Sequence, residues 1–315
     1  MNFKHVLVTG AAGLLGRYIV EELQGHCEVV GFDLKAGPAP IEWRLGSVTD
    51  PAAVAAAVAG KDAIVHVAAI PNIWSGSGDE MMQVNVLGVY RLLAAAEEAG
   101  VKRVVLCSSG AVTGFTVRDG GSVLIPPESL PIDVDAPLKP TDPYSLSKML
   151  GEEIGRSFAL RGKLEIVILR PAFIAYPEMY GELRARAAAP QTYKGRQAGG
   201  PASAGGGPCW NHVDPRDMAT SFRKALELQD VVFERFFVYA KVTLSPKPTL
   251  ERLRDVLGSV PPLRKPEIYA ENPFAPLEDI TLTRDRLGFE PKFDARNVCI
   301  LTPPAGVEAN SGAAS

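Results

Sequence analysis

A glycine-rich turn near the N-terminus constrains this chain most. Residues 9–16 read Thr-Gly-Ala-Ala-Gly-Leu-Leu-Gly, directly after an apolar stretch at residues 6–9 and at the start of a helical pattern over residues 14–23. Glycines at this spacing allow a tight turn between a strand and a helix and let the helix pack closely on the strand. The segment therefore predicts the β–turn–α unit of an α/β protein with a parallel sheet.

The rest of the first half alternates strand-like and helix-like patterns. We expect strands near residues 28–32, 43–48, 62–68, 102–108 and 164–169, and helices near residues 51–60, 81–99, 144–161 and 215–228. Such alternation is typical of a parallel sheet with helices on both faces. Residues 115–143 read as loop, and the Gly- and Pro-rich residues 195–208 read either as a lid over a site or as a surface loop.

The same glycine-rich turn predicts a dinucleotide site. Gly10 would make the turn, Gly13 would let a pyrophosphate approach the backbone, and the helix N-terminus would offer N–H groups and positive partial charge. Asp33 ends the second strand, where a carboxylate can bind the adenosine ribose hydroxyls and repel a 2′-phosphate. NAD is therefore favoured over NADP, a preference that Lys35 weakens slightly. A plain structural turn and a surface aspartate are the alternatives.

A second pattern predicts proton-transfer chemistry. Tyr144 and Lys148 are four residues apart, so they share one face of a helix. A free phenol has a pKa of about 10, and a nearby ammonium and a positively charged nicotinamide would both stabilise the phenolate. Tyr144 could then exchange a proton with a substrate hydroxyl. Ser109 follows a strand at the sheet edge where α/β proteins bind ligands, so it could hydrogen-bond the reacting oxygen, or simply cap a turn.

Together these motifs resemble the extended short-chain dehydrogenase/reductases, in the NAD-dependent epimerase/dehydratase group. The resemblance covers about residues 3–293. It rests on Thr-Gly-x-x-Gly-x-x-Gly at 9–16, Asp33, His-Val-Ala-Ala at 66–69, Asn-Val-Leu-Gly at 85–88, Ser108-Ser109, Pro-Tyr-x-x-Ser-Lys at 143–148, Leu-Arg-Pro at 169–171, His-Val-Asp at 212–214 and Leu-Gly-Phe-Glu-Pro at 287–291.

The resemblance implies an α/β fold with a Rossmann-type doubly wound parallel sheet and a smaller C-terminal substrate-binding domain. Residues 1–170 would form the NAD-binding core, residues 171–300 would mostly bind substrate with some segments returning to the core, and residues 301–315 read as a disordered tail. The catalytic residues would be Ser109, Tyr144 and Lys148. The cofactor-binding residues would be Gly10, Gly13, Leu14, Leu15, Gly16, Asp33, Ser47, Val48, Ala68, Ala69, Asn85, Tyr144, Lys148, Pro171 and Ile174.

The chain departs from this family pattern at several positions. Gly110 and Ala111 stand where dehydratases of the group carry an Asp-Glu pair, so elimination of water is disfavoured. Ser47 stands where many relatives bind the adenine through an aspartate. His66 reads as a packed strand residue rather than a proton carrier.

The substrate side departs as well. Phe173 stands where nucleotide-sugar enzymes often have asparagine, and no arginine precedes the His-Val-Asp signature, although Arg184, Arg186, Lys194 and Arg196 could compensate. These changes argue against a sugar diphosphate, which arginine would clamp by charge-assisted bonds. The substrate-binding residues would instead be Ser109, Phe173, Tyr176 and Trp210, the three aromatics walling the pocket or, alternatively, packing in the core.

The leading hypothesis is therefore NAD-dependent hydride transfer at a secondary alcohol or ketone of a sugar or similar small molecule, with Tyr144 as the acid/base. The alternatives are a nucleotide-sugar epimerase that keeps its NAD bound, and a nonenzymatic dinucleotide-binding regulator. The family usually dimerises through two long helices, here near residues 81–99 and 144–161, so we expect a homodimer.

Composition excludes other classes of partner. A net charge of −3 offers no basic field for nucleic acid. No apolar run approaches the roughly 20 residues of a membrane span. The first residues have no long apolar region and no small-residue cleavage site of a signal peptide, so we expect a cytoplasmic protein. The four cysteines and four histidines lack metal-ligand spacing, so we expect no metal and reduced thiols in the cytoplasm.

Overall fold

Seven parallel strands form the central sheet of this protein. The computed structural model describes residues 3–115, 124–188 and 210–298. The sheet has the order β3-β2-β1-β4-β5-β6-β9. Its strands are β1 (His5–Thr9), β2 (Glu28–Asp33), β3 (Glu42–Leu45), β4 (Ala63–His66), β5 (Arg103–Cys107), β6 (Glu165–Pro171) and β9 (Phe233–Val238). Every pairing in this sheet is parallel.

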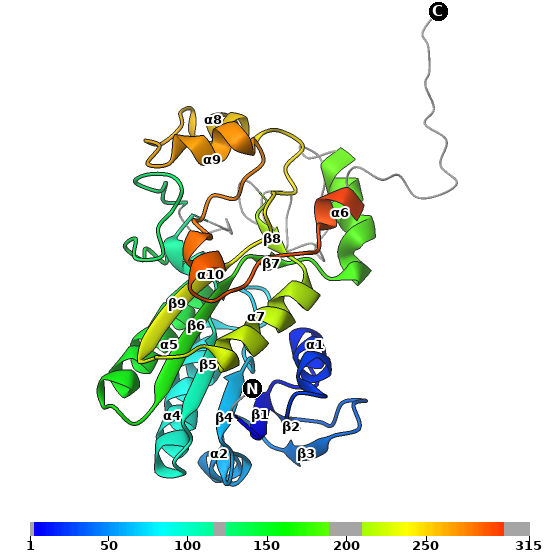
Figure 1. The fold of residues 1–315 in the computed structure, drawn as a ribbon, viewed down its shortest axis with the longest axis vertical. Helices are drawn as coiled ribbons and strands as arrows, with labels where there is room; N and C mark the ends of the chain where they lie inside the picture. The colour runs from blue at the N-terminus through cyan, green and yellow to red at the C-terminus, as the bar shows by residue number, and fades with distance from the viewer. Residues whose placement is uncertain (1–2, 116–123, 189–209, 299–315) are drawn as a thin grey trace, which may run out of the picture.

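Helices cover both faces of the sheet, as the alternating pattern predicted (Figure 1). One face packs against α1 (Leu14–Leu23) and α7 (Pro215–Glu227), and the other against α2 (Pro51–Val58), α4 (Gly88–Glu98) and α5 (Pro143–Leu160). Side chains of β1 alternate between the two cores: Val6 and Val8 face the first, and Leu7 faces the second. This period-2 alternation confirms the predicted doubly wound Rossmann-type sheet.

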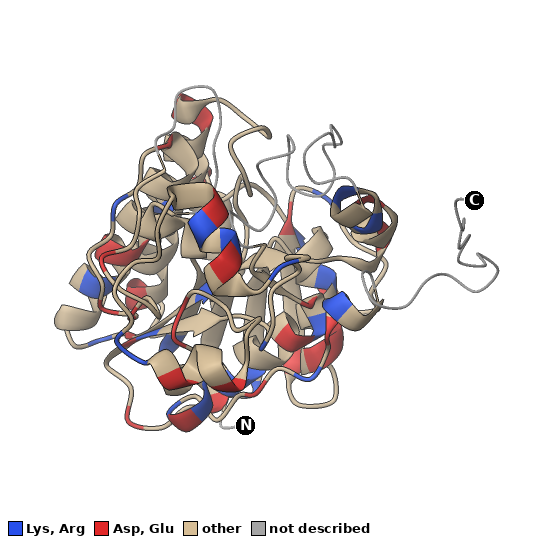
Figure 2. Ribbon diagram, turned by 90° about the horizontal axis from the view of Figure 1, so that it is seen from above, with Lys and Arg blue, Asp and Glu red and all other residues tan. Residues whose placement is uncertain are grey.

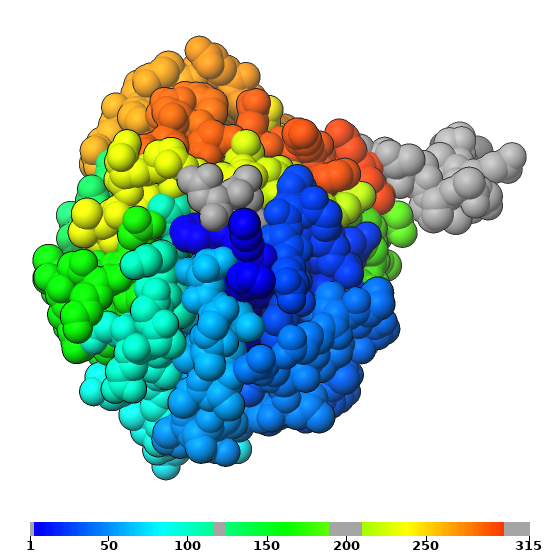
Figure 3. Space-filling model, turned by 60° about the horizontal axis from the view of Figure 1, so that its bottom comes forward, coloured from blue at the N-terminus to red at the C-terminus, as the bar shows by residue number. Residues whose placement is uncertain are grey.

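The second half of the chain adds to the sheet and also builds a cap over its carboxyl edge. Strand β9 and helix α7 join the main sheet and its first helical layer. The other elements are β7 (Phe173–Ile174), β8 (His212–Val213), α6 (Tyr180–Ala188), α8 (Thr249–Leu257), α9 (Pro266–Glu271) and α10 (Thr281–Asp285). Figure 3 shows the orange α8–α9 region at one end of the molecule and the light blue α2 region at the other.

The helix expected near residues 81–99 is built from three segments. These are α3 (Gly78–Met81), a π-helical segment (Met82–Leu87) and α4. The π-helical segment carries Asn85, whose side chain hydrogen-bonds to the backbone of Ile70. Single π-helical turns inside helices often mark functional positions, and this one lies directly behind the cavity described below.

The structure can be compared with the sequence-based expectations for surface charge, membrane-spanning helices and metal sites. Lys and Arg are interspersed with Asp and Glu over the ribbon (Figure 2), in keeping with the small net charge. Within the described ranges, no helix is both long and apolar enough to span a bilayer, and no cluster of His, Cys, Asp or Glu could hold a metal ion. The possible lid at residues 195–208 and the tail at residues 301–315 lie outside the described residues.

Candidate active site

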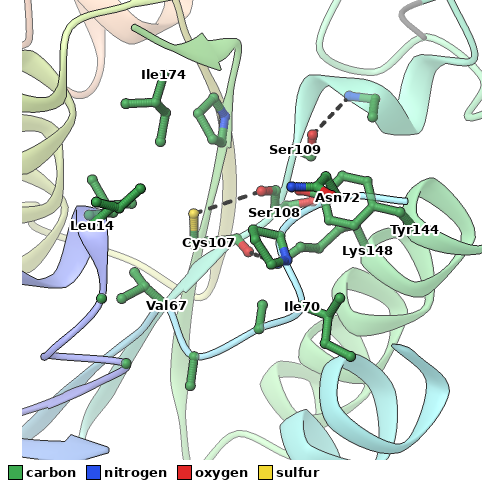
Figure 4. Close-up of a pocket in the computed structure, with 18 of the residues that line it drawn as sticks. Leu14, Val67, Ile70, Asn72, Cys107, Ser108, Ser109, Tyr144, Lys148 and Ile174 are labelled. Atoms are coloured by element: carbon green, nitrogen blue, oxygen red, sulfur yellow. Dashed lines mark hydrogen bonds between the residues drawn. The ribbon is translucent and has the colours of Figure 1, made fainter. Parts of the chain in front are cut away.

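A cavity of about 680 Å³ opens at the carboxyl ends of the sheet strands. Residues that follow β1, β2, β4, β5 and β6 all contribute to its wall. This is the edge at which open α/β sheets bind ligands, because the loops that leave the strands diverge there. Figure 4 shows Leu14, Val67, Ser109, Lys148 and Ile174 around it.

The glycine-rich turn forms one end of this cavity. Gly10 has φ of +70°, and a Cβ there would lie 2.7 Å from the backbone nitrogen of Ala68. A Cβ on Gly16 would overlap the carbonyl oxygen of Gly10. Only glycine therefore lets α1 start so close to β1. Gly13 is the N-cap of α1 and provides no capping side chain, so the helix N-terminus opens toward the cavity.

Asp33 lies beside this turn and is held by backbone amides. Its Oδ2 accepts a hydrogen bond from Ala12 N at 2.9 Å, and its Oδ1 accepts one from Leu34 N at 2.7 Å. Ser47 and Val48 continue the same part of the wall. The Ser47 Oγ accepts a hydrogen bond from Thr49 N at 3.1 Å, which orients the hydroxyl that replaces the family's aspartate.

Tyr144 and Lys148 reach the cavity from α5. Asp142 caps this helix by accepting a hydrogen bond from Ser145 N at 2.8 Å, and Pro143 is the first helical residue. The two side chains project from one helix face into the cavity, Tyr144 beside Ser109 and Lys148 toward Cys107 (Figure 4), and the Lys148 Nζ lies 5.8 Å from the centre of the Tyr144 ring. The ammonium donates a hydrogen bond to the Cys107 carbonyl at 2.9 Å.

Burial dominates the proton affinity of both groups. It raises the pKa of Tyr144 above that of a free phenol, and a hydrogen bond with Ser109 partly offsets this effect. Burial also lowers the pKa of Lys148. The sequence predicted that Lys148 would lower the pKa of Tyr144. In the structure burial raises that pKa instead, because the free-energy cost of burying a phenolate outweighs the stabilisation that neighbouring groups provide. Burial therefore holds Tyr144 as the neutral phenol.

Ser109 combines the two roles that its position suggested. It ends the loop after β5 and caps the 3₁₀ helix Gly110–Thr113, where its Oγ accepts a hydrogen bond from Ala111 N at 3.1 Å. The same side chain is a hydrogen-bond partner of Tyr144. Capping fixes the direction of the hydroxyl, so it faces the phenol within the cavity.

Most of the residues expected to bind cofactor or substrate share this cavity. They are Gly10, Gly13, Leu14, Leu15, Gly16, Asp33, Ser47, Val48, Ala68, Ala69, Ser109, Tyr144, Lys148, Pro171, Phe173, Ile174 and Tyr176. Their common position at one sheet edge follows from the parallel topology, which brings distant loops together.

Asn85 and Trp210 lie elsewhere. Asn85 is behind the main wall, where its amide bonds both backbone groups of Ile70 and donates to Ser147 Oγ at 2.9 Å. It ties the loop after β4 to α5. Trp210, expected to contact substrate, instead packs in an apolar cluster with Leu183 and Leu244, and the Arg186 guanidinium lies 4.5 Å from its ring centre. The indole is buried in this cluster and is not among the described residues of the cavity wall, which favours core packing, the alternative given for this side chain.

His66 has a structural position in β4. Its Nδ1 lies 2.7 Å from the Thr9 hydroxyl on the neighbouring strand. Burial lowers the pKa of His66 to about 3, so the ring is neutral at physiological pH. It links two strands and does not reach the main cavity wall.

Two groups of side chains near the site were not recognised as groups from the sequence. Glu152 on α5 receives two hydrogen bonds from Arg170 on β6, at 2.9 and 2.7 Å, and a further one from Ser108. This buried ion pair fastens α5 to the two strands beside it. A single arginine within an apolar strand pattern was the signal that could have revealed it.

The second group lines the cavity itself. Asn211, Tyr239 and Glu278 meet on its wall although they are widely spaced in the chain. No periodicity marks Glu278, and only Asn211 adjoins a recognised signature. Contacts between distant loops have no local pattern, so sequence reasoning did not find them.

Known proteins resemble this chain over most of the described fold. The sequence model of the "NAD dependent epimerase/dehydratase family" matches residues 6–235. Uronate dehydrogenase of Pseudomonas putida is 33% identical over 173 residues, which are 53% of this chain and 60% of that protein. L-arabinose 1-dehydrogenase (NAD(P)(+)) of Haloferax volcanii is 33% identical over 171 residues, which are 52% of this chain and 65% of that protein. The chain thus spans less than two thirds of the length of these relatives.

A solved structure agrees over a longer range. A short-chain dehydrogenase/reductase superfamily protein from Agrobacterium tumefaciens, crystallised with bound NAD, has a TM-score of 0.67 and 27% identity. The similarity covers 92% of this chain and 93% of that one. Because the family's sequence model also matches well over half of the chain, this protein belongs to the NAD dependent epimerase/dehydratase family, as its motifs predicted.

Proposed function

We propose that the protein is an NAD-dependent oxidoreductase that transfers hydride at a secondary alcohol or ketone of a sugar or sugar-like small molecule. One observation carries this proposal: Ser109, Tyr144 and Lys148 line the same cavity as the glycine-rich turn and Asp33. Proton-transfer groups and a dinucleotide cradle therefore meet in one space. The named activities of the two curated relatives support the same reaction class.

The cavity residues fit NAD. The uncapped N-terminus of α1 would bind the pyrophosphate, since a side chain at Gly10 or Gly16 would obstruct the turn. Asp33 would accept hydrogen bonds from the adenosine ribose and oppose a 2′-phosphate. When bound, NAD would supply the hydride acceptor or donor at the end of the cavity where Tyr144 lies.

Side chains of the protein would transfer the proton to or from the substrate oxygen. Ser109 would hydrogen-bond the reacting substrate oxygen, and the Tyr144 phenol would donate a proton to it during ketone reduction or accept one during alcohol oxidation. Oxidation requires the phenolate, which burial disfavours. The Lys148 ammonium and the Ser109 hydroxyl are the groups placed to stabilise it.

A nucleotide-sugar epimerase is the second candidate. It would need to bind a sugar diphosphate, yet Lys148 is the sole cation among the described residues of the cavity wall. Arg184 donates to the Val298 carbonyl and Arg186 packs on Trp210. Lys194 and Arg196 lie outside the described residues. Phe173 lines the wall instead of a polar side chain. A nonenzymatic regulator is disfavoured because the Tyr144–Lys148 pair faces the cavity.

The direct test is NADH absorbance with purified protein, NAD or NADP, and a panel of sugars, sugar acids, secondary alcohols and UDP-sugars. We expect NADH to appear with at least one free sugar or alcohol, and Tyr144→Phe to lose turnover while NAD affinity stays nearly unchanged. Tyr269→Phe is the matched control, because that phenol bonds the Pro276 carbonyl away from the cavity. An epimerised UDP-sugar without NADH would support the second candidate. Full activity of Tyr144→Phe would refute the mechanism.

We also propose a homodimer built on α4 and α5. Tyr90 on α4 and Leu160 on α5 are exposed apolar side chains, with 50% and 73% of their surface accessible. Such side chains on two neighbouring helices are suited to a subunit interface. Light scattering should give twice the 33.6 kDa chain mass, and Tyr90→Asp with Leu160→Asp should give the monomer mass. A monomeric wild-type protein would contradict the proposal.

A cytoplasmic location is proposed with the same activity. Cys27 and Cys107 are free thiols among the described residues, as expected where thiols stay reduced. Cell fractionation would test this location.

A further inference from the structure

A polar cluster on the cavity wall takes no part in the chemistry described above. It consists of Glu278, Tyr239 and Asn211, which are only 4%, 3% and 7% exposed and which we call the Glu278 cluster. Asn211 Nδ2 donates a hydrogen bond to Glu278 Oε2 at 2.6 Å, and the Tyr239 hydroxyl is also hydrogen-bonded to the Glu278 carboxyl group. All three side chains line the cavity that holds Ser109 and Tyr144.

The cluster lies beside the reacting end of the cavity. The Tyr239 hydroxyl packs against Gly110, the residue that follows Ser109, so closely that a Cβ there would overlap it. Gly110 lines the cavity as well. A substrate whose reacting oxygen bonds Ser109 would therefore have its neighbouring groups within reach of this cluster.

The cluster has unused hydrogen-bonding capacity. Asn211 Oδ1 is buried and has no hydrogen-bond partner among the residues that the structure describes. Native proteins leave few buried acceptors unpaired, because each costs free energy. This oxygen is closed off from solvent, so a ligand hydroxyl would satisfy it only after the amide turns toward the cavity that Asn211 lines.

The cluster is also fixed in place. Ile132 N donates to the Leu277 carbonyl at 2.7 Å, and Asp279 N donates to the Ile132 carbonyl at 2.9 Å, which holds the backbone on both sides of Glu278. The residues on both sides of Asn211 are likewise hydrogen-bonded through their carbonyl groups. Preorganised groups of this kind lose little entropy when a ligand binds.

The charges around the cluster favour an uncharged partner. Burial raises the pKa of Glu278 to about 8, so near neutral pH this carboxyl group can both donate and accept hydrogen bonds. Lys148, the one cation of the described wall, already donates to the Cys107 carbonyl. Arg170 is bound to Glu152. A carboxylate placed beside Glu278 would lose its hydration without gaining a cationic partner among the described residues.

We propose that Glu278, Tyr239 and Asn211 recognise a hydroxyl group of the substrate, and that this cluster selects neutral sugars over the corresponding uronates. The inference rests on the proposed sugar oxidoreductase activity and names its substrate class. Glu278 is here a specificity-determining residue, and proton transfer stays with Tyr144.

The test compares neutral aldoses with their uronates, galactose with galacturonate and glucose with glucuronate, for wild type, Glu278→Met and Tyr239→Phe. Two quantities are measured: kcat/KM from NADH formation, and equilibrium sugar binding to the protein saturated with NAD. Glu290→Met is the matched control, because Glu290 is an exposed carboxylate that pairs with Lys241 outside the cavity. NAD affinity and circular dichroism show whether each variant is folded.

We expect the wild type to prefer the neutral sugars. Glu278→Met and Tyr239→Phe should each lower kcat/KM and sugar affinity for the neutral sugar by roughly 10- to 100-fold, as for loss of a buried hydrogen bond. NAD affinity should stay within about twofold, and Glu290→Met should behave as wild type. A wild-type preference for uronates, or folded cluster variants with unchanged neutral-sugar kinetics and binding, would overturn the proposal.

The two measurements also separate this proposal from the proposed activity. Sugar binding that depends on Glu278 without any NADH formation would support the recognition cluster and refute the oxidoreductase. NADH formation that is insensitive to Glu278 and Tyr239 would support the oxidoreductase and refute the cluster. Neither binding nor turnover with any sugar would refute both.

Discussion

The phenol oxygen of Tyr239 occupies the space in which a side chain at Gly110 would have to begin. The sequence showed only that a carboxylate of the dehydratases is missing at this position. In the structure, an aromatic ring from the segment after β9 fills the space, and the carboxyl group on this part of the wall comes from Glu278. The glycine that follows Ser109 is therefore a steric requirement of this cavity wall.

This contact predicts a compensating pair of substitutions. Gly110→Ala should destabilise the protein by about 1–3 kcal/mol, because overpacking forces Tyr239 or the loop to move. Tyr239→Phe removes the overlapping oxygen and leaves the ring carbon 3.0 Å from the new Cβ. Gly110→Ala should then lower the free energy of unfolding clearly less in the Tyr239→Phe variant than in wild type. Urea unfolding of the four proteins of this cycle measures the coupling, and equal costs in both backgrounds would contradict the contact.

Asp33 should determine the choice of cofactor. Asp33→Ala removes the carboxylate that opposes a 2′-phosphate, so the ratio of NAD to NADP affinity should fall by roughly 10- to 100-fold. The Ala12 amide also loses its acceptor, so some loss of overall affinity is expected. Fluorescence titration with both cofactors gives the ratio. Asp50→Ala, at the cap of α2, is a suitable control, and an unchanged ratio in Asp33→Ala would remove Asp33 from the cofactor site.

Removing one partner of the buried ion pair between Arg170 and Glu152 should lower the free energy of unfolding far more than removing one partner of an exposed pair. Glu152→Ala leaves a fully buried guanidinium without its partner and should cost about 3–5 kcal/mol of unfolding free energy. The double variant Glu152→Leu/Arg170→Met should lose less, because no unpaired charge remains.

The adjacent residue provides the control for this pair. Glu153 bonds Arg156 on the exposed face of the same helix, so Glu153→Ala should cost less than about 1 kcal/mol. Denaturant unfolding compares all three variants. Equal losses for Glu152→Ala and Glu153→Ala would show that burial does not govern the pair.

Glu278 should make folding stability depend on pH in a recognisable direction. Burial raises the pKa of Glu278 from an ordinary value of 4.5 to about 8. Between these values the folded state binds more protons than the unfolded state, so the contribution of Glu278 to stability falls as pH rises. The slope is at most about 1.4 kcal/mol per pH unit. Glu278→Gln lacks this group.

The measurement is the difference in unfolding free energy between Glu278→Gln and wild type at several pH values. The unfolding free energy of the variant should rise relative to that of wild type from pH 5 to pH 8, and the difference should then stay constant. Taking the difference removes the contributions of other titrating groups, including His66, whose lowered pKa acts in the opposite direction at acid pH. A difference that does not change with pH would contradict a buried, largely protonated Glu278.

Local spacing in the sequence determined much of the fold and the central part of the candidate site. The helix expected at residues 14–23 is α1, with the same bounds, and α2 begins at Pro51 after its Asp50 cap. The Tyr144–Lys148 pair was recognisable because two residues four apart share a helix face whatever the rest of the chain does. Patterns of this kind depend on backbone geometry within a few residues.

Tertiary structure alone decided the rest of the wall. Three distant segments converge over the sheet edge: Asn211 just before β8, Tyr239 just after β9, and the segment of Glu278, whose neighbours bond the backbone of Ile132. Only this convergence brings the three side chains together. Trp210 is an aromatic residue of the kind expected in a sugar pocket, yet the apolar cluster around Leu183 buries it. The environment of each side chain depends on which distant segments pack against it. Burial by those segments also governs the pKa of Tyr144, and no spacing along the chain encodes that burial.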